Sequence, residues 1–407
     1  MRVLITGQSG VSHDTVRHNL EEQIIDSTGY RERDILSKDI GNVIKNDIGQ
    51  DWWAFLESGN QEWQKDICNE AIEIVMAQIE DEAPEVVLLS THLCMFRKSR
   101  YFTPIDWKRF IKYSPDNVIT LIDDIYTVQS RINRREDQRY GADTYLRLRE
   151  LITWRSIEIL MTDRMVDFIN SHKSKSLENY VVSVKHPKSM LYDLLFTPEK
   201  PVVYGGTSLS TPRSSDAGIA EVNSYRNKLS DSFVVFDPVT IDEAILNFKF
   251  FERDSGRLKT KFQETDELSL SVEDRWPLSF GENEPLCDDE GEYPITLDVD
   301  EVREVSVSIS GQRMSDIENQ IRNRDFRLIN QSEIMIGYRP FFRGSKSTGL
   351  LAELRFAHHS IHMPIYIVHN DETDGNLGGH PFDIKARKCE STDEMIDNIR
   401  QKYETSI

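Results

Sequence analysis

Cysteine is scarce in this chain of 407 residues, and its four cysteines lie far apart. No two of them form a Cys-x-x-Cys pair, which disfavours both a cysteine-based zinc site and a disulfide framework. We therefore expect free, mostly structural thiols. The cysteines are Cys68, Cys94, Cys287 and Cys389.

Long apolar runs are also missing. No stretch approaches the length needed to cross a bilayer, so we expect no membrane partner. Met1 is followed directly by the strand-like run Arg2–Thr6, which lacks the basic start and long apolar stretch of a secretory signal. The sequence therefore predicts a cytoplasmic protein.

Positive charge is in deficit, with 49 Lys and Arg against 69 Asp and Glu and a formal net charge of -20. Affinity for nucleic acid comes largely from Lys and Arg that neutralise phosphates, so this balance argues against a nucleic-acid partner. A nucleotide can still bind in a local pocket.

The length favours two domains, and both halves alternate strand patterns with helical ones. This alternation predicts an α/β fold in which each domain is a parallel sheet flanked by helices. In the first half we expect helices over 14–25 and 52–79 and strands over 2–6, 85–90, 118–122 and 180–184.

The domain boundary is expected near Pro198, which gives domains 1–197 and 198–407. An acidic, poorly periodic stretch at about 252–300 interrupts the second domain, and we interpret it as a solvated insertion. Around it we expect helices over 216–229, 316–324 and 349–359 and strands ending at Tyr204 and over 233–236, 333–338 and 364–368.

The first candidate site is a glycine loop between the first strand and the first helix. Such a loop can present backbone N–H groups to a phosphate. A working phosphate loop also needs a lysine, and His13 occupies that position with Asp14 beside it. A tight strand-to-helix turn remains an equal explanation. The candidate nucleotide-binding residues are Gly7, Gly10, Ser12, His13, Thr15 and, further along the chain, Arg131.

With this loop, residues 1 to about 195 resemble the adenylate-kinase-like branch of phosphate-loop kinases. The resemblance rests on the loop, Thr91-His92, Pro115-Asp116, Asp123-Asp124, Arg131, Trp154-Arg155 and Val184–Pro187. In that family the loop carries a lysine, and an acidic residue lies near the Thr-His pair. His13 and Ser90 replace them in this sequence, which argues against phosphoryl transfer. The resemblance thus implies a nucleotide-binding, sensing or scaffold module. Arg131 either faces phosphates or belongs to a solvated helix face.

The second candidate site lies in the C-terminal half. Asp325 ends one predicted helix, a strand follows, and the Ser/Thr/Gly loop Ser345–Gly349 starts a helix that carries Glu353. A loop at a helix N-terminus can seat an anion and present a carboxylate beside it. Two carboxylates near one pocket can divide the nucleophile and proton-transfer roles of glycosyl transfer.

This half, from about Pro201 to Asp383, resembles the nucleoside 2-deoxyribosyltransferase superfamily, including its nucleoside 5′-monophosphate N-glycosidase branch. The shared features are a strand ending in Tyr204 followed by small residues, Asp325 before an apolar strand, the Ser/Thr/Gly loop, Glu353, and Ala357 leading to Pro364–Val368.

The resemblance implies that Glu353 attacks the anomeric carbon, that Asp325 assists or holds the departing base, and that Tyr204 positions Glu353. Ser347, six residues before Glu353, takes the place of a serine that contacts the 5′-phosphate in the hydrolases. The resemblance therefore implies a nucleotide substrate. Further substrate-binding candidates are Thr348, Gly349, Gly206, Thr207 and Ser208, with Ser210 and Arg213 as possible phosphate contacts.

Each residue also has a purely structural explanation. Glu353 could pair with Arg355 or Lys346, and Tyr204 could be a core aromatic. Asp325 could cap its helix or pair with Arg322 or Arg324. His358 and His362 share a helical face, but without a third ligand at a suitable spacing they predict no metal site.

The function predicted from the sequence is a hydrolase or transferase that cleaves the N-glycosidic bond of a nucleotide without a cofactor, because the carboxylate does the chemistry. The resemblance also implies a homo-oligomer. Three alternatives stay open: a non-enzymatic nucleotide sensor, an NAD-cleaving effector, and a working kinase with an unusual loop.

Overall fold

The structure is a computed structural model, and it describes residues 1–97, 100–140, 145–173, 176–208, 212, 215–243, 246, 267–270, 285–287, 295–306, 314–374 and 384–404. Most of the acidic insertion expected at about 252–300 lies outside these residues. The chain divides into two compact units, Met1–Lys185 with Leu286–Glu290, and His186–Pro285 with Gly291–Ile407. The boundary expected near Pro198 falls inside the second unit, after helix α8 (Lys188–Phe196).

The first unit is built on a parallel five-stranded sheet in the order β2-β3-β1-β6-β7. Four of its strands are those expected from the sequence. The fifth, β2, was missed because its run Ile-Leu-Ser-Lys-Asp is short and half polar. The strands are β1 (Arg2–Gly7), β2 (Ile35–Asp39), β3 (Val86–Ser90), β6 (Asn117–Ile122) and β7 (Asn179–Ser183).

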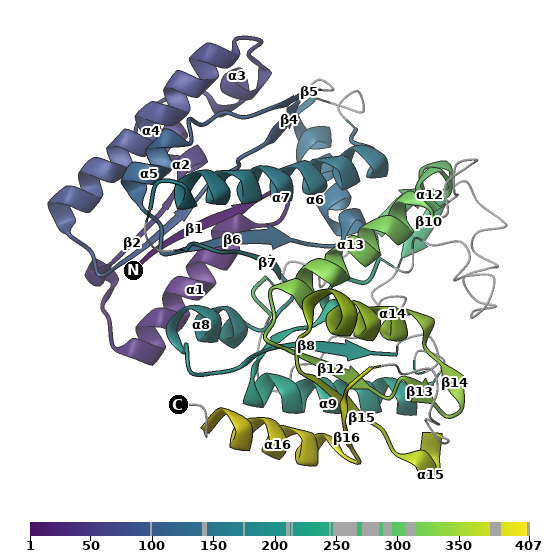
Figure 1. Ribbon diagram of the computed structural model, residues 1–407. Coiled ribbons are helices and arrows are strands. Elements are labelled where there is room, and N and C mark those ends of the chain that lie inside the picture. The colour runs from purple at the N-terminus through teal and green to yellow at the C-terminus, as the bar shows by residue number, and fades with distance from the viewer. Residues whose placement is uncertain are drawn as a thin grey trace. The chain divides into compact units, whose positions relative to one another are not determined.

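Helices cover both faces of this sheet, as Figure 1 shows. Leu4 and Val118 belong to a buried cluster with residues of α4 (Gln61–Glu82) and α7 (Leu148–Asn170). Helix α1 (His13–Thr28) packs on β1, β2 and β3 on the other side. The unit also contains the helices α2 (Ile40–Asn46), α3 (Trp52–Glu57), α5 (Lys108–Tyr113) and α6 (Ile125–Tyr140).

The single helix predicted over 52–79 is wrong, because the structure divides it into α3 and α4. The break falls at Ser58-Gly59-Asn60, where the Asn60 side chain accepts a hydrogen bond from the N–H of Trp63 at 3.1 Å and caps α4. Asparagine satisfies a first-turn N–H group in this way, so the sequence carried a helix start within the expected helix.

The second unit holds a parallel sheet in the order β16-β15-β12-β8-β9. Numbered along the chain and read from the β9 edge, this order is 2-1-3-4-5, the flavodoxin-like arrangement of a doubly wound sheet. The topological switch point, where such sheets bind ligands, lies between β8 and β12. The strands are β8 (Val202–Thr207), β9 (Val234–Phe236), β12 (Ile334–Tyr338), β15 (Ile365–Val368) and β16 (Arg387–Cys389).

The two faces of this sheet are covered by different helices. Helices α9 (Asp216–Ser232) and α16 (Thr392–Glu404) share a buried cluster with Val203 and Ile336. The other face carries α13 (Asp316–Asn330) and α14 (Thr348–Phe356). Helix α14 continues into the π-helical turn Ala357–Ile361. The expected α/β class, with parallel sheets flanked by helices, is thereby confirmed.

No helix in the described part of the chain is both long and apolar enough to cross a membrane.

Candidate functional site

Strand β8 directs Tyr204 towards the face covered by α13 and α14. Side chains alternate along a strand, and Val203 and Gly205 face α9. A Cβ on Gly206 would lie 2.8 Å from Leu350 of α14 and 3.1 Å from the Tyr204 ring. Glycine at position 206 therefore allows α14 to approach the strand beside Tyr204.

Helices α13 and α14 bring the two candidate carboxylates to the same place. The rings of Phe326 and Phe356 stack with centroids 4.0 Å apart and join the helices. Asp325 precedes the first ring and is 7% exposed. It lies inside α13 rather than at its end, because the helix continues to Asn330. Glu353 lies one turn before the second ring, and its Oε2 is buried.

The charges of this cluster are strongly coupled. Burial and the nearby charge of Asp325 raise the pKa of Glu353 to about 8. Burial also raises the pKa of Asp325, against the opposing effect of Arg324. Arg324 donates to Asp325 Oδ1 at 2.7 Å and lies 3.9 Å from Glu243. The arginine therefore opposes the effect of burial on Asp325, and the raised pKa of Glu353 favours its protonated form at neutral pH.

Tyr204 is fully buried, and its hydroxyl faces Glu353. This hydroxyl favours the carboxylate form of Glu353 and so lowers its pKa, while burial raises the pKa of Tyr204 itself. Among the described residues, neither the hydroxyl nor Glu353 Oε2 has a partner at full hydrogen-bond geometry. An unsatisfied polar pair in a buried place is costly, and such groups mark functional sites.

The loop residues expected to bind substrate lie at the start of α14. Ser347 is the N-cap, and its side chain accepts a hydrogen bond from the N–H of Leu350 at 3.4 Å. Thr348 and Gly349 are exposed at the same end. At the end of β8, Thr207 and Ser208 are buried. Ser210 and Arg213 lie outside the described residues.

The histidines after Glu353 lie on the π-helical turn. His362 Nδ1 lies 2.9 Å from the carbonyl oxygen of His358, so a backbone group is the partner of this ring nitrogen. The part of the chain that the structure describes contains no group of three or more His, Cys, Asp or Glu side chains suited to a metal ion.

A smaller pocket, of about 370 Å³, lies at the carboxyl ends of β12 and β15 on the side of α9. Arg339 there has a positive φ of 46°, an uncommon conformation for a non-glycine residue. Its guanidinium pairs with Asp374 and Glu221. The cation is thus neutralised by the protein, and none of the predicted site residues lines this pocket.

In the first unit, the glycine loop has the shape expected of a strand-to-helix turn. Gly7 and Gly10 have φ values of 153° and 90°, and Ser12 is the left-handed N-cap of α1. A Cβ on Gly7 would lie 2.7 Å from the carbonyl oxygen of Leu121. Only glycine fits there, so the close packing of β1 and β6 accounts for this residue without a ligand.

Arg131 supports the loop from α6. Its guanidinium donates to the carbonyl oxygen of Gly10 at 3.0 Å and to Asp123 at 2.7 Å. Asp123 is fully buried at the end of β6, and Lys185 lies 3.7 Å from it. Arg131 therefore has a structural role in this state, and it does not line the pocket in front of the loop.

A buried glutamate accepts a hydrogen bond from the start of the loop. Glu158 of α7 accepts backbone hydrogen bonds from Gly7 at 3.3 Å, Leu93 at 2.8 Å and Cys94 at 2.6 Å. Burial raises the pKa of Glu158 to about 8, although these three N–H groups favour its ionised form. The N–H of Gly7 and two N–H groups of the loop after β3 therefore donate to a carboxyl group of the protein itself.

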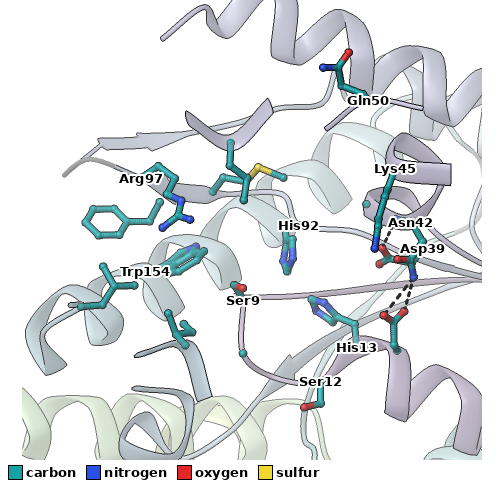
Figure 2. Close-up of a pocket in the computed structure, with 18 of the residues that line it drawn as sticks. Ser9, Ser12, His13, Asp39, Asn42, Lys45, Gln50, His92, Arg97 and Trp154 are labelled. Atoms are coloured by element: carbon teal, nitrogen blue, oxygen red, sulfur yellow. Dashed lines mark hydrogen bonds between the residues drawn. The ribbon is translucent and has the colours of Figure 1, made fainter. Parts of the chain in front are cut away.

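The pocket in front of the loop has a volume of about 770 Å³ (Figure 2). Its polar end includes Ser9, Gly10, Ser12, His13 and Thr15, together with Asp14, Asp39, Asn42 and His92. Phe96 and Trp154 lie at its other end beside Arg97 (Figure 2). The lining also includes the apolar side chains of Leu56, Met95, Ile132 and Leu146. Four residues of the polar end are the predicted loop candidates Gly10, Ser12, His13 and Thr15.

His13 is neutral in this pocket. Burial, followed by the neighbouring His92, lowers the pKa of His13 well below its ordinary value. The two rings lie 4.7 Å apart between centroids. His13 is 8% exposed, and its Nε2 has no hydrogen-bond partner among the residues that the structure describes.

Sequence reasoning missed residues of both sites. Asp39 ends β2, and its Oδ2 accepts a hydrogen bond from Ser90 at 2.7 Å, so a carboxylate does lie beside the Thr-His pair. Its signal was a carboxylate at the end of a strand, but β2 itself was not recognised. Arg324, one of the two arginines considered as partners of Asp325, does pair with it. Glu243 was missed because nothing in its local sequence shows that it meets the candidate catalytic cluster.

No family model matches the chain, and neither does any curated protein. Solved structures do resemble its N-terminal half at low identity. Shikimate kinase from Acinetobacter baumannii in complex with shikimate is 13% identical, with a TM-score of 0.31 over 48% of this chain and 93% of the kinase. Shikimate kinase from Bacteroides thetaiotaomicron is 12% identical, with a TM-score of 0.26 over 45% and 85%. A sugar kinase from Janibacter sp. is 12% identical, with a TM-score of 0.26 over 48% and 92%. Scores this low carry no conclusion about the activity of this chain.

Proposed function

We propose that the second unit cleaves the N-glycosidic bond of a nucleotide, with Glu353 as the nucleophile and the first unit as a binding or scaffold module. One observation carries this proposal: Tyr204 of β8, Asp325 of α13 and Glu353 of α14 form one electrostatically coupled cluster. They come from three separate segments of the chain. A helix-surface glutamate paired with Arg355 or Lys346 would not be buried against a tyrosine.

The proposed reaction is a double displacement. Ionised Glu353 forms a bond to the anomeric carbon, and the bond from that carbon to the base nitrogen breaks. The base leaves with the electron pair, takes a proton from solvent and is held by Asp325. Water then attacks the anomeric carbon and gives its proton to solvent, while the bond from that carbon to Glu353 breaks, which releases the sugar and regenerates the carboxylate. If a second base attacks instead, the reaction is a transfer.

The proton on Glu353 must leave before the attack. It leaves as pH rises through the raised pKa of Glu353, about 8, and the hydroxyl of Tyr204 favours the resulting carboxylate. A raised pKa on one carboxylate beside a second carboxylate is the usual way in which such pairs divide their roles.

A nucleotide fits this site better than a nucleoside because positive charge gathers before α14. Arg343 and Lys346 are exposed on the hairpin of β13 (Phe341–Phe342) and β14 (Ser345–Lys346). They lie next to the Ser347 N-cap, where the helix dipole also favours an anion. The 5′-phosphate is the only group of a nucleoside monophosphate that matches these cations.

The direct test is release of free base. The purified protein is incubated with ribo- and deoxyribonucleoside 5′-monophosphates, nucleosides and NAD, and the products are separated by chromatography. Glu353→Gln should abolish release while preserving the shape of the side chain. Glu199→Gln, an exposed glutamate in the same unit, is the matched control and should react like the wild type.

Release from monophosphates that only Glu353→Gln lacks supports the proposal. Release from NAD alone would instead favour a dinucleotide-cleaving effector. If the folded wild-type protein releases no base from any of these compounds, the proposal fails and the non-enzymatic sensor becomes the better account.

A further inference from the structure

The pocket of the first unit is chemically unlike a phosphate site. In the loop position where a cation would neutralise a phosphate, His13 is neutral and has an unpartnered Nε2. Its imidazole points into the pocket, as Figure 2 shows. Asp14 and Asp39 lie on the same side, and both would repel a phosphate.

The backbone donors of the loop are also partly occupied. Glu158 takes the N–H of Gly7. Arg131, the predicted cation of this site, is engaged by Gly10 and Asp123. The residues around the loop thus leave little positive charge for a phosphate.

The charged residues that line the whole pocket nearly balance. They are Asp14, Asp39 and Asp51 against Lys45 and Arg97. Arg97 lies 3.8 Å from Glu57, which offsets its charge, and the Lys45 side chain points towards Asp39 and Asn42 in Figure 2. A pocket with balanced charge favours an uncharged ligand over a dianion.

The polar end suits hydroxyl groups. Asp39 Oδ1 accepts the N–H of Asn42 at 3.0 Å and Oδ2 accepts Ser90, so each oxygen keeps one lone pair for another donor. Asp14 is held nearby through the amide of Asn42 at 3.2 Å. Carboxylates at strand ends bind the hydroxyls of ribose in nucleotide-binding sheets. The imidazole of His13 lines the same end of the pocket.

The size and the apolar end complete the match. A volume of about 770 Å³ exceeds the need of a free sugar and falls within the range for small organic ligands. The aromatic side chains of Phe96 and Trp154 and the aliphatic side chains of the lining can cover an apolar ring. We infer that this pocket binds a free nucleoside, with its ribose diol on Asp39 and Asp14 and without a phosphate.

This inference goes beyond the proposed function, since it gives the protein a second ligand site of different charge preference. The test uses the full-length chain with Glu353→Gln, so that no turnover disturbs the titration. Isothermal calorimetry compares adenosine, guanosine, cytidine and uridine with their 5′-monophosphates. At least one nucleoside should have a dissociation constant about tenfold lower than that of its own monophosphate, or lower still.

Two variants locate this binding. Asp39→Asn keeps the cap of α2 but removes the charge that holds the diol, and it should weaken nucleoside binding about tenfold. Asp26→Asn, at an exposed position of α1, should have no effect. The matching 2′,3′-dideoxynucleoside lacks the two ribose hydroxyls. Its affinity for the pocket with Asp39 intact should equal the affinity of the nucleoside for the Asp39→Asn variant.

A third variant tests the role of His13. His13→Lys restores a cation to the loop and should move the preference from the nucleoside towards its monophosphate. Circular dichroism verifies that each variant is folded.

The inference is overturned if the monophosphates bind as tightly as the nucleosides, if Asp39→Asn and Asp26→Asn behave alike, or if no nucleoside binds at millimolar concentration. Base release by the wild-type protein is a separate measurement. Loss of that activity with intact, Asp39-dependent nucleoside binding would refute only the proposed function.

Discussion

The hydroxyl of Tyr204 and the carboxyl group of Glu353 face each other between strand β8 and helix α14. The tyrosine hydroxyl favours the ionised glutamate, while burial and Asp325 favour the protonated one. The balance between these opposing effects sets the pH at which Glu353 becomes a nucleophile.

The rate of base release should therefore rise with pH. Since the pKa of Glu353 is raised to about 8, the reactive carboxylate of the free protein increases as pH passes through that value. The pH profile of kcat/KM measures this rise. Asp325→Asn removes the neighbouring negative charge and should move the ascending limb to lower pH. A profile that is flat between pH 6 and about 9 would contradict the assignment of Glu353.

Tyr204→Phe should have the opposite effect on the profile. Without the hydroxyl, the pKa of Glu353 rises further, so the ascending limb moves to higher pH. Stability should change little, since no fully formed hydrogen bond of this hydroxyl is lost among the described residues. The pH profile and urea unfolding are measured together. A large loss of stability with an unmoved profile would make Tyr204 a core residue only.

Glu353→Gln should also change how stability depends on pH. The folded-state pKa of Glu353 lies above the unfolded value, so this group contributes stability below pH 4.5, and that stability is lost as pH rises through about 8. The variant should match the wild type near pH 5 and exceed it by a few kcal/mol near pH 9. Urea unfolding at both pH values tests this, and an equal difference at the two would refute it.

Arg324→Gln should destabilise the second unit. The arginine is buried and pairs with Asp325 and Glu243, and its removal leaves buried carboxylates without their cation. We expect a loss of about 3–5 kcal/mol in the free energy of unfolding. Arg322→Gln, an exposed position of the same helix, should cost less than about 0.5 kcal/mol. Similar values for the two would show that the buried pairs contribute little.

Gly7→Ala should disrupt the turn before α1. The new Cβ would approach the carbonyl oxygen of Leu121 to 2.7 Å at a φ of 153°, so the strand or the loop must shift. A loss of about 2–4 kcal/mol is expected. Gly49→Ala, where φ is also positive but no atom lies within 4 Å, should cost only about 1 kcal/mol. Thermal unfolding of both variants separates steric overlap from backbone strain.

The alternation of strand and helix patterns was sufficient to predict the α/β class and most strands. Buried parallel strands such as Val118–Ile122 are almost wholly apolar, and this property is local to the sequence. Strand β2 and the break before α4 were missed for local reasons as well: one strand is half polar, and the Asn60 cap lies within a helical pattern.

The sequence by itself determined which residues can do chemistry: it contains Glu353, Asp325 and Tyr204, and it replaces the loop lysine by His13. Only the tertiary structure decided their states. Burial between β8, α13 and α14 puts a proton on Glu353, and Arg324 holds Asp325. Asp39 reaches Ser90 because β2 and β3 are neighbours in the sheet. The physical reason is that pKa values and pocket charge depend on desolvation and on groups distant in sequence, which no local pattern records.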